Sequence, residues 1–296
     1  MRTSHLTTGI KSAAGASVEQ RGAPPRDAVY SGVSETWCFL WSGPGDAAWN
    51  MAVDEWLLST AHLRPPVLRL YGWLRPTVSL GRHEPWRDVV DLRKLELSGV
   101  DLVRRPTGGR AVLHDREITY SVTAPIGDGA TWSARLDTSL SSISKALVRG
   151  LREVGVPAEF APMAKHSAPR STGRLCFEST TRYELRSGGV KAVGSAQYRT
   201  EKGFLQHGSI PSRATLAALW RLGPGTSPCP ADPELPREVA ELADRPGEEV
   251  AAALARGFEE EFGVCGVWRG PEVVDRPAAE QLVTAKYASA EWTLRR

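Results

Sequence analysis

The alternation of apolar and polar residues predicts a chain of short strands interrupted by a few amphipathic helices. Between residues 67 and 125, five short apolar runs are separated by Gly, Pro and Asp, which is typical of strands. They read VLRLYGW, TVSLGRH, DLVRRP, AVLHD and EITYSVTAP. A further strand is expected at FLQHGSIP, after a hairpin that turns at SGG.

Helical periodicity occurs in three places. Asp46 is placed to cap a first helix, Asp137 to open a second that ends at Gly155, and a third covers residues 248–262. The apolar faces of the first two helices carry Trp49, Ala52, Val53 and Trp56, and Leu140, Ile143, Leu147, Leu151 and Val154. These elements predict an α+β domain around a mixed, largely antiparallel sheet flanked by helices.

Composition divides the chain and excludes several classes of protein. Residues 1–34 are rich in Ser, Gly, Ala and Pro without apolar periodicity, so we expect a disordered tail before a single domain at 35–296. The net charge of +3 gives no reason to expect nucleic acid binding. We find no apolar run long enough for a membrane helix and no secretory signal, so a cytoplasmic protein with reduced thiols is expected.

Four cysteines are present, and their spacing argues against a metal site. Cys38, Cys176, Cys229 and Cys265 are far apart, with no CxxC motif or Cys/His ligand pair. Cys38 and Cys265 have apolar neighbours and are expected to be small buried hydrophobes. Cys229 lies between prolines in a predicted loop, with no base near it in the sequence.

Cys176 has a different setting. It follows the flexible RSTGR run, and Lys191 comes fifteen residues later, across the predicted SGG turn. A cation beside an accessible thiol lowers the pKa of that thiol, and the thiolate is the nucleophile. The residues alone leave a reactive nucleophile and an inert thiol equally open.

The stretch RRPTGGRAVLHD, residues 104–115, contains three arginines and a Gly-Gly pair between two predicted strands. Its composition favours a tight hairpin with solvated arginines, although glycines also let a ligand approach the backbone. No phosphate-loop motif is present. His114 and Asp115 are adjacent, so on a strand they point to opposite sides and cannot form a direct pair. His114 and His207 are each expected to be hydrogen-bonded structural residues.

Several of these blocks together resemble a known family. RRPTGGRAVLHDREITYSV, LCFESTTRYEL, VKAVGSAQYR and LQHGSI are similar to the lipoate/octanoate transferases, which share a fold with biotin and lipoate protein ligases. NMAVDEWLL, RPTVSLGRHE and the closing KYASAEWTLRR extend the likeness over about residues 41–296. The resemblance implies a class II synthetase-like domain.

The sequence around the cysteine resembles the LipM type, the octanoyl-acyl carrier protein:protein N-octanoyltransferases. Lipoate ligases lack a cysteine at this place, and octanoyl amidotransferases usually carry it in a YCPG-like sequence, whereas this chain reads CFESTTRYEL. Glu84 in GRHE departs from the Gln or Asn that is expected there.

The resemblance implies a mechanism and a set of residues. Cys176 would take octanoyl from octanoyl-acyl carrier protein and pass it to a lysine of a 2-oxoacid dehydrogenase lipoyl domain or of the glycine-cleavage H protein. Lys191 would stabilise the thiolate. The implied substrate-binding residues are Arg105, Gly108, Gly109, Arg110, Ala111, His114, Gly194 and Ser195. Of the two adjacent arginines, alternation directs only one to the ligand, and Arg105 is the expected one over Arg104.

A monomer that uses no metal and no cofactor is expected. Three alternatives remain open: an ATP-dependent lipoate–protein ligase, an octanoyl-H-protein:protein amidotransferase, and a carrier-binding protein without activity.

Overall fold

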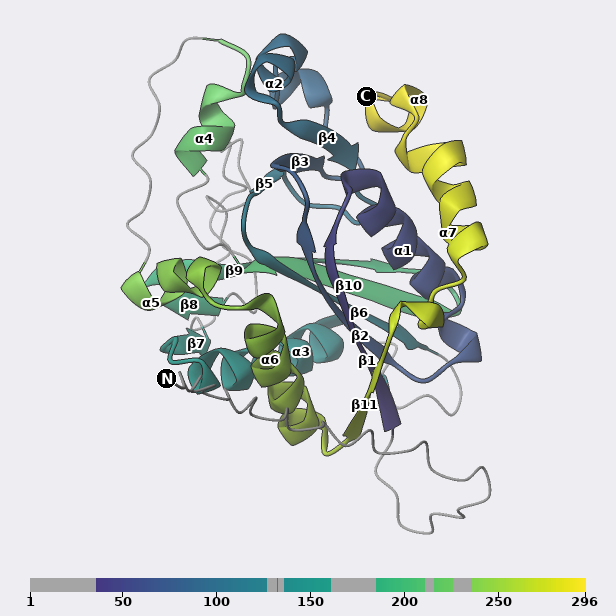
Figure 1. Cartoon of the computed structure of the whole chain (residues 1–296), viewed down its shortest axis with the longest axis vertical. Coiled ribbons are helices and arrows are strands. Elements are labelled where there is room, and N and C mark those ends of the chain that lie inside the picture. The colour runs from purple at the N-terminus through teal and green to yellow at the C-terminus, as the bar shows by residue number, and fades with distance from the viewer. Residues whose placement is uncertain (1–35, 127–131, 133–135, 161–184, 211–215, 226–235) are drawn as a thin grey trace, which may run out of the picture. The chain divides into compact units, whose positions relative to one another are not determined.

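An eight-stranded sheet forms the centre of the fold (Figure 1). The computed structural model describes residues 36–126, 132, 136–160, 185–210, 216–225 and 236–296, so the predicted tail at 1–34 lies outside it. In spatial order the strands are β11 (Cys265–Arg269), β1 (Thr36–Gly45), β2 (Val67–Trp73), β6 (Ile118–Pro125), β10 (Gly203–Ile210), β9 (Val190–Arg199), β8 (Leu185–Ser187) and β7 (Ala158–Phe160). β1 is parallel to both neighbours and all other pairs are antiparallel, which confirms the mixed, largely antiparallel sheet.

A second, three-stranded sheet shows that the RRPTGGR stretch is not a hairpin. β3 (Thr77–Leu80) lies in the middle, parallel to β4 (Asp101–Arg104) and antiparallel to β5 (Val112–His114). The chain therefore leaves β4, crosses the end of β3 and returns as β5. Arg104 and Arg105 are both buried, so the expectation of solvated arginines is also wrong.

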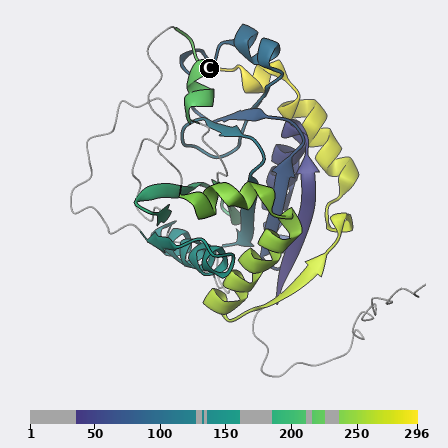
Figure 2. The same ribbon diagram turned by 60° about the vertical axis from the view of Figure 1, so that its left-hand side comes forward.

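Alternation along β1 divides the packing between the two faces of the main sheet. Trp37 and Phe39 pack in one core with helices α3 (Leu136–Glu153) and α6 (Gly247–Phe262). Leu40 packs on the other face, with α1 (Ala47–Ser59) and α7 (Arg276–Leu282). Figures 1 and 2 show the two helix pairs on opposite sides of the sheet, with β11 along its outer edge beside β1.

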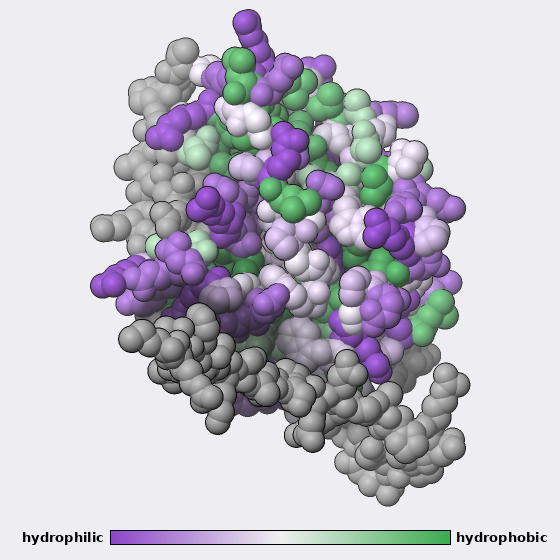
Figure 3. Space-filling view, viewed as in Figure 1, coloured by the Kyte–Doolittle hydropathy of each residue, from purple (hydrophilic) through white to green (hydrophobic). Residues whose placement is uncertain are grey.

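Three of the remaining helices pack beside the smaller sheet: α2 (Leu92–Ser98), α4 (Leu216–Arg221) and α8 (Ala290–Thr293). The short α5 (Arg237–Ala240) packs in the core of the main sheet, and a π-helical turn at Val283–Tyr287 precedes α8. On the face seen in Figure 3, hydrophobic residues lie in small groups among hydrophilic ones. Within the described part of the chain, no helix combines the length and apolarity that crossing a bilayer demands.

The predicted helix boundaries hold to within one residue. Asp46 occupies the N-cap of α1, although its side chain accepts no capping hydrogen bond. α3 begins at Leu136, one residue before the expected Asp137, and α6 begins at Gly247, one residue before the expected start. Gly155 follows α3 with φ of 83°, a left-handed conformation that glycine adopts without strain.

Candidate active site

A pocket lies where the two sheets meet α1. Its floor is a row of residues that stand directly opposite one another on four neighbouring strands: Gly194 on β9, Ser209 on β10, Thr119 on β6 and Tyr71 on β2. Gly109 and Ser195 are exposed at one end, and Met51 and Tyr71 are fully buried at the other. The pocket therefore has a mouth at β9 and a closed end at β2 and α1.

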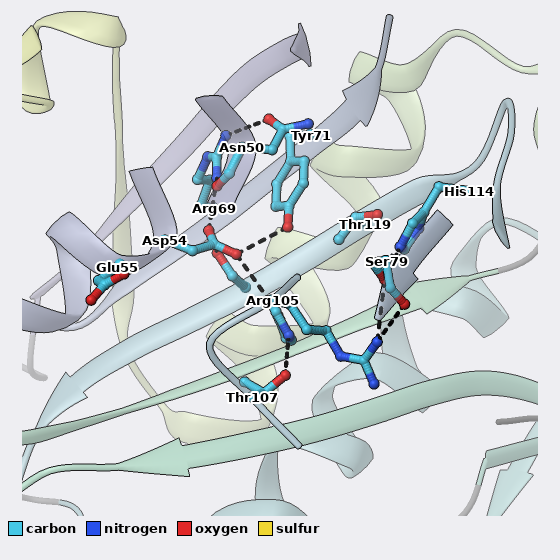
Figure 4. Close-up of polar contacts among 12 residues, drawn as sticks. Asn50, Asp54, Glu55, Arg69, Tyr71, Ser79, Arg105, Thr107, His114 and Thr119 are labelled. Carbon is cyan, nitrogen blue, oxygen red and sulfur yellow. Dashed lines mark hydrogen bonds and ion pairs between the residues drawn. The ribbon is translucent and has the colours of Figure 1, made fainter. Parts of the chain in front are cut away.

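Asp54 of α1 is the centre of a buried polar network beneath the pocket (Figure 4). Its carboxylate accepts hydrogen bonds from Arg69 at 2.7 Å, Ser121 at 2.8 Å, Tyr71 at 3.0 Å and His207 Nδ1 at 3.1 Å. Burial alone would raise the pKa of Asp54, but the charge of Arg69 and the hydrogen bond from His207 outweigh it and lower the pKa. Asp54 is therefore an ionised carboxylate with all its partners supplied by the protein.

His207 links this network to the loop between β4 and β5. Because its Nδ1–H donates to ionised Asp54, its Nε2 accepts the hydroxyl hydrogen of Thr107, at 2.6 Å. Burial lowers the pKa of His207 despite the nearby carboxylate, so the imidazole is neutral. The expectation of a hydrogen-bonded structural histidine is confirmed, and the bond fixes Thr107 in the loop.

His114, on β5 of the smaller sheet, forms a second group of hydrogen bonds at the pocket. Its Nδ1 is hydrogen-bonded to Glu117 at 2.5 Å and its Nε2 to the hydroxyl of Ser79 at 2.7 Å, and its ring stacks on Trp73 with centroids 4.1 Å apart. Asp115 is exposed whereas His114 is buried, as the alternation argument predicts for adjacent residues on a strand. The partner is Glu117, which the sequence reasoning missed.

Arg105 fastens the glycine loop to the smaller sheet. Its guanidinium donates to the carbonyl of Ser79 at 2.8 Å and to those of Gly108 and Arg110 at 2.8 and 2.7 Å. Arg104 points away and donates to the carbonyl oxygens of other segments. Of the two arginines, Arg105 lines the pocket and Arg104 does not.

Glu84 also holds the glycine loop between β4 and β5, through hydrogen bonds from the backbone. Its carboxylate accepts from the backbone N–H of Gly81 at 3.0 Å and of Ala111 at 3.1 Å. Burial raises its pKa, against the opposing effect of these two bonds and of Arg105. A carboxylate offers both its oxygens to two N–H donors, whereas the expected Gln or Asn has one acceptor oxygen, so the departure in GRHE has a structural reason.

Gly81 is required because it touches the loop. A Cβ at this position would lie 1.8 Å from the carbonyl oxygen of Gly109. We expect Gly81→Ala to lower the free energy of unfolding by about 1–3 kcal/mol, because backbone atoms must separate. Urea denaturation measures this. Gly72→Ala is the matched control, since its nearest neighbour would be 3.7 Å away, and equal losses in the two variants would contradict the prediction.

Most of the expected substrate-binding residues lie at this pocket, and of the expected catalytic pair only Lys191 belongs to the described residues. Arg105, Gly109, His114, Gly194 and Ser195 line it, while Gly108, Arg110 and Ala111 belong to the loop held by Arg105 and Glu84. Lys191 is half-buried near the start of β9, opposite Arg186, and outside the lining. Cys176 lies outside the described residues.

Of the other cysteines, Cys229 also lies outside the described residues. Cys38 is half-buried against the α1 and α7 core, and burial raises the pKa of its thiol. Cys265 is exposed, so its expected burial is wrong: among the described strands, β11 is at the edge of the sheet and pairs with β1. Among described side chains, no three His, Cys, Asp or Glu residues are grouped as metal ligands would be.

Residues 46–258 match the family model of the lipoyl protein ligase A/B catalytic domain. An octanoyltransferase LipM of Kyrpidia tusciae is 41% identical over 277 residues, which is 88% of this chain and 100% of that protein. An octanoyltransferase LipM of Moorella thermoacetica is 37% identical and covers 89% of this chain and 99% of its own length.

Solved structures confirm the expected fold. Lipoate-protein ligase A bound with ATP superposes with a TM-score of 0.68 at 24% identity, over 88% of this chain and 99% of that one. A bi-partite lipoate protein ligase from Thermoplasma acidophilum gives a TM-score of 0.66 at 21% identity, over 88% and 96%. The chain therefore belongs to the lipoyl protein ligase A/B catalytic domain family and, within it, to the LipM octanoyltransferases.

Proposed function

We propose that this protein takes octanoyl from octanoyl-acyl carrier protein and transfers it, through a thioester on Cys176, to a lysine of a lipoyl domain or of the H protein. The Cys176 thiolate attacks the donor thioester, and the carrier's thiol leaves. The acceptor ε-amine then attacks octanoyl-Cys176, forms the amide and releases the thiolate. Thioester exchange is nearly balanced in free energy, so the reaction needs no ATP. The proposal includes a monomeric cytoplasmic enzyme without metal or cofactor.

The observation that carries this proposal is the pocket across the sheet. Strands are spaced by about 4.8 Å, so the row from Gly194 to Tyr71 spans about 14 Å. An extended octanoyl chain, with seven C–C bonds of about 1.5 Å, is about 9 Å long. The row is therefore long enough for the chain to lie with its carbonyl at the mouth and its methyl end towards β2.

The polar floor residues do not oppose an apolar chain, because their hydrogen bonds are directed elsewhere. Ser209 donates to Glu117 at 2.5 Å, and Thr119 donates to the same carboxylate at 3.2 Å. Trp73 donates its indole N–H to Thr119 at 2.9 Å. Covering these groups with an acyl chain therefore leaves no donor unpaired.

Lys191 lies on the strand that forms the pocket mouth. It precedes Gly194 by three residues on β9, about 10 Å along the strand. Cys176 precedes β8, the neighbour of β9, by nine residues. In this proposal the cation favours the thiolate of Cys176 and stabilises the developing oxyanion.

The identity of the acyl donor distinguishes the proposed function from its alternatives. We expect an unmodified lipoyl domain to gain octanoyl from octanoyl-acyl carrier protein without ATP, as read by intact mass. Free octanoate or lipoate with ATP and Mg²⁺ should give no product. Efficient use of the free acid would identify a lipoate–protein ligase, and preference for octanoyl-H protein as donor would identify an amidotransferase.

Met51 is expected to limit the length of the acyl chain. It is 1% exposed and closes the buried end of the pocket from α1. Met51→Ala should raise the relative rate with a decanoyl donor by about tenfold, since its two added CH₂ groups, at about 0.8 kcal/mol each, could then be buried. Competition between donors of two lengths measures this. Met51→Leu conserves volume and should retain the octanoyl preference; an unchanged preference in Met51→Ala would place the closed end elsewhere.

A further inference from the structure

Four basic residues form a cluster beside the pocket mouth, called here the basic cluster. They are the half-buried Arg82 and the exposed His83, Arg295 and Arg296. The C-terminal segment reaches β4 through two hydrogen bonds, from Trp292 to the carbonyl of Arg104 at 2.8 Å and from Arg104 to the carbonyl of Thr293 at 3.0 Å. Arg295 then donates to the carbonyl of Arg82 at 2.6 Å. Residues more than 200 positions apart are thus held together.

The charges of the basic cluster are not neutralised within the described chain. Slight desolvation, and after it the positive charges of Arg296, Arg82, Arg295 and Arg104, lower the pKa of His83. None of the four residues forms an ion pair with a described Asp or Glu side chain.

Two guanidinium groups of the basic cluster are held by aromatic rings instead. Arg82 lies over the ring of Tyr198 at 4.6 Å and Arg295 over that of Trp292 at 3.8 Å. Ring stacking orders a guanidinium without cancelling its charge. The nearest carboxylate in sequence, that of Glu84, is turned inward to backbone N–H groups.

The basic cluster adjoins the mouth without lining the pocket. Arg82 donates its backbone N–H to Thr107 at 2.8 Å, and Gly81 touches Gly109. Tyr198, under Arg82, is two residues from Ala196, which lines the pocket. A partner bound on the basic cluster therefore sits beside the mouth, and its acyl group must reach the pocket on an arm.

We propose that the basic cluster docks an acidic face of the protein that delivers the acyl chain on a flexible thioester-bearing arm. This rests on the proposed function, since it concerns the donor of the same reaction. Complementary charge increases the encounter rate and sets the orientation of the complex, and it acts most strongly at low salt. The acceptor is the weaker candidate, because a lysine side chain is short and must approach the mouth directly.

The test is charge reversal by Arg295→Glu with Arg296→Glu. We expect KM for octanoyl-acyl carrier protein to rise by about tenfold at low ionic strength with kcat nearly unchanged, and the difference to shrink in about 0.5 M salt. KM for octanoyl-pantetheine, which has neither protein nor phosphate, should change less than about twofold. Lys145→Glu with Lys202→Glu is the matched control, since both side chains are exposed and the charge change is the same.

Three results would overturn the proposal. An unchanged KM for the carrier-bound donor removes the docking role. An equal rise with octanoyl-phosphopantetheine assigns the basic cluster to the phosphate of the arm. A rise confined to the acceptor lipoyl domain assigns it to the acceptor. Failure of the wild-type protein with both donors would instead contradict the proposed function, so the two failures are distinguishable.

Discussion

Replacing Cys176 with alanine is expected to reduce octanoyl transfer by about 10³-fold or more, because removing a catalytic nucleophile leaves only binding and positioning. The wild-type protein, mixed with octanoyl-acyl carrier protein alone, should gain one octanoyl group that hydroxylamine releases. The variant should gain none. Intact mass spectrometry reads both results, and steady-state transfer to a lipoyl domain gives the rate.

Cys265→Ala is the control for this experiment, because Cys265 is an exposed thiol on an edge strand, away from the pocket lining. It should keep wild-type activity and still form the acyl-enzyme. A hydroxylamine-sensitive adduct that persists in Cys176→Ala would show that another residue carries the acyl group. Normal transfer by that variant would exclude the covalent route.

The alternation of apolar and polar residues predicted best the strands whose own sequence shows it clearly. β2 occupies the whole of the predicted run VLRLYGW, and β10 differs from its predicted run by one residue at each end. β11 was missed because CGVWR is short and exposed, and it becomes a strand by pairing with the edge of β1, more than 200 residues earlier. Such a strand is defined by its partner, which a local window does not contain.

The residues of the candidate site also divide into those with a local sequence signal and those that depend on distant partners. Conformationally special residues, such as the glycines of RRPTGGR, are visible in sequence because their type constrains the backbone. The floor row from Gly194 to Tyr71 is not visible, since it depends on the register of three strand pairs. Asp54 and Glu117 carry one usable signal: each is an acidic residue beside an apolar run, and buried acids are rare unless paired.

The first helix shows why Asp54 was overlooked. The predicted apolar face of α1 is real, but Val53 and Trp56 from it pack towards α7. The side of α1 that faces the main sheet carries Asn50 and Asp54, which bind Arg69 of β2. A helix that is buried on two sides can pack one face by apolar contacts and the other by hydrogen bonds. Apolar periodicity reveals only the apolar face.

Asp54→Asn is expected to lower the free energy of unfolding by about 3–5 kcal/mol, because it leaves the guanidinium of Arg69 buried without a counter-charge. Both side chains are 0% exposed, so water cannot replace the lost carboxylate. Urea denaturation at neutral pH measures the effect. Glu280→Gln is the control, since its bond to Arg276 is exposed and should contribute less than about 1 kcal/mol.

The effect of Asp54 should also depend on pH in a defined direction. The folded-state pKa of Asp54 is lowered, so its stabilisation is fully present above the unfolded value of about 3.9 and is lost as pH falls through the folded value. The difference between wild type and Asp54→Asn should therefore be constant near neutrality and shrink only below about pH 4. A difference that already shrinks between pH 7 and 5 would locate the titrating group elsewhere. His207 is the first alternative, because burial lowers its pKa below the ordinary value of 6.5.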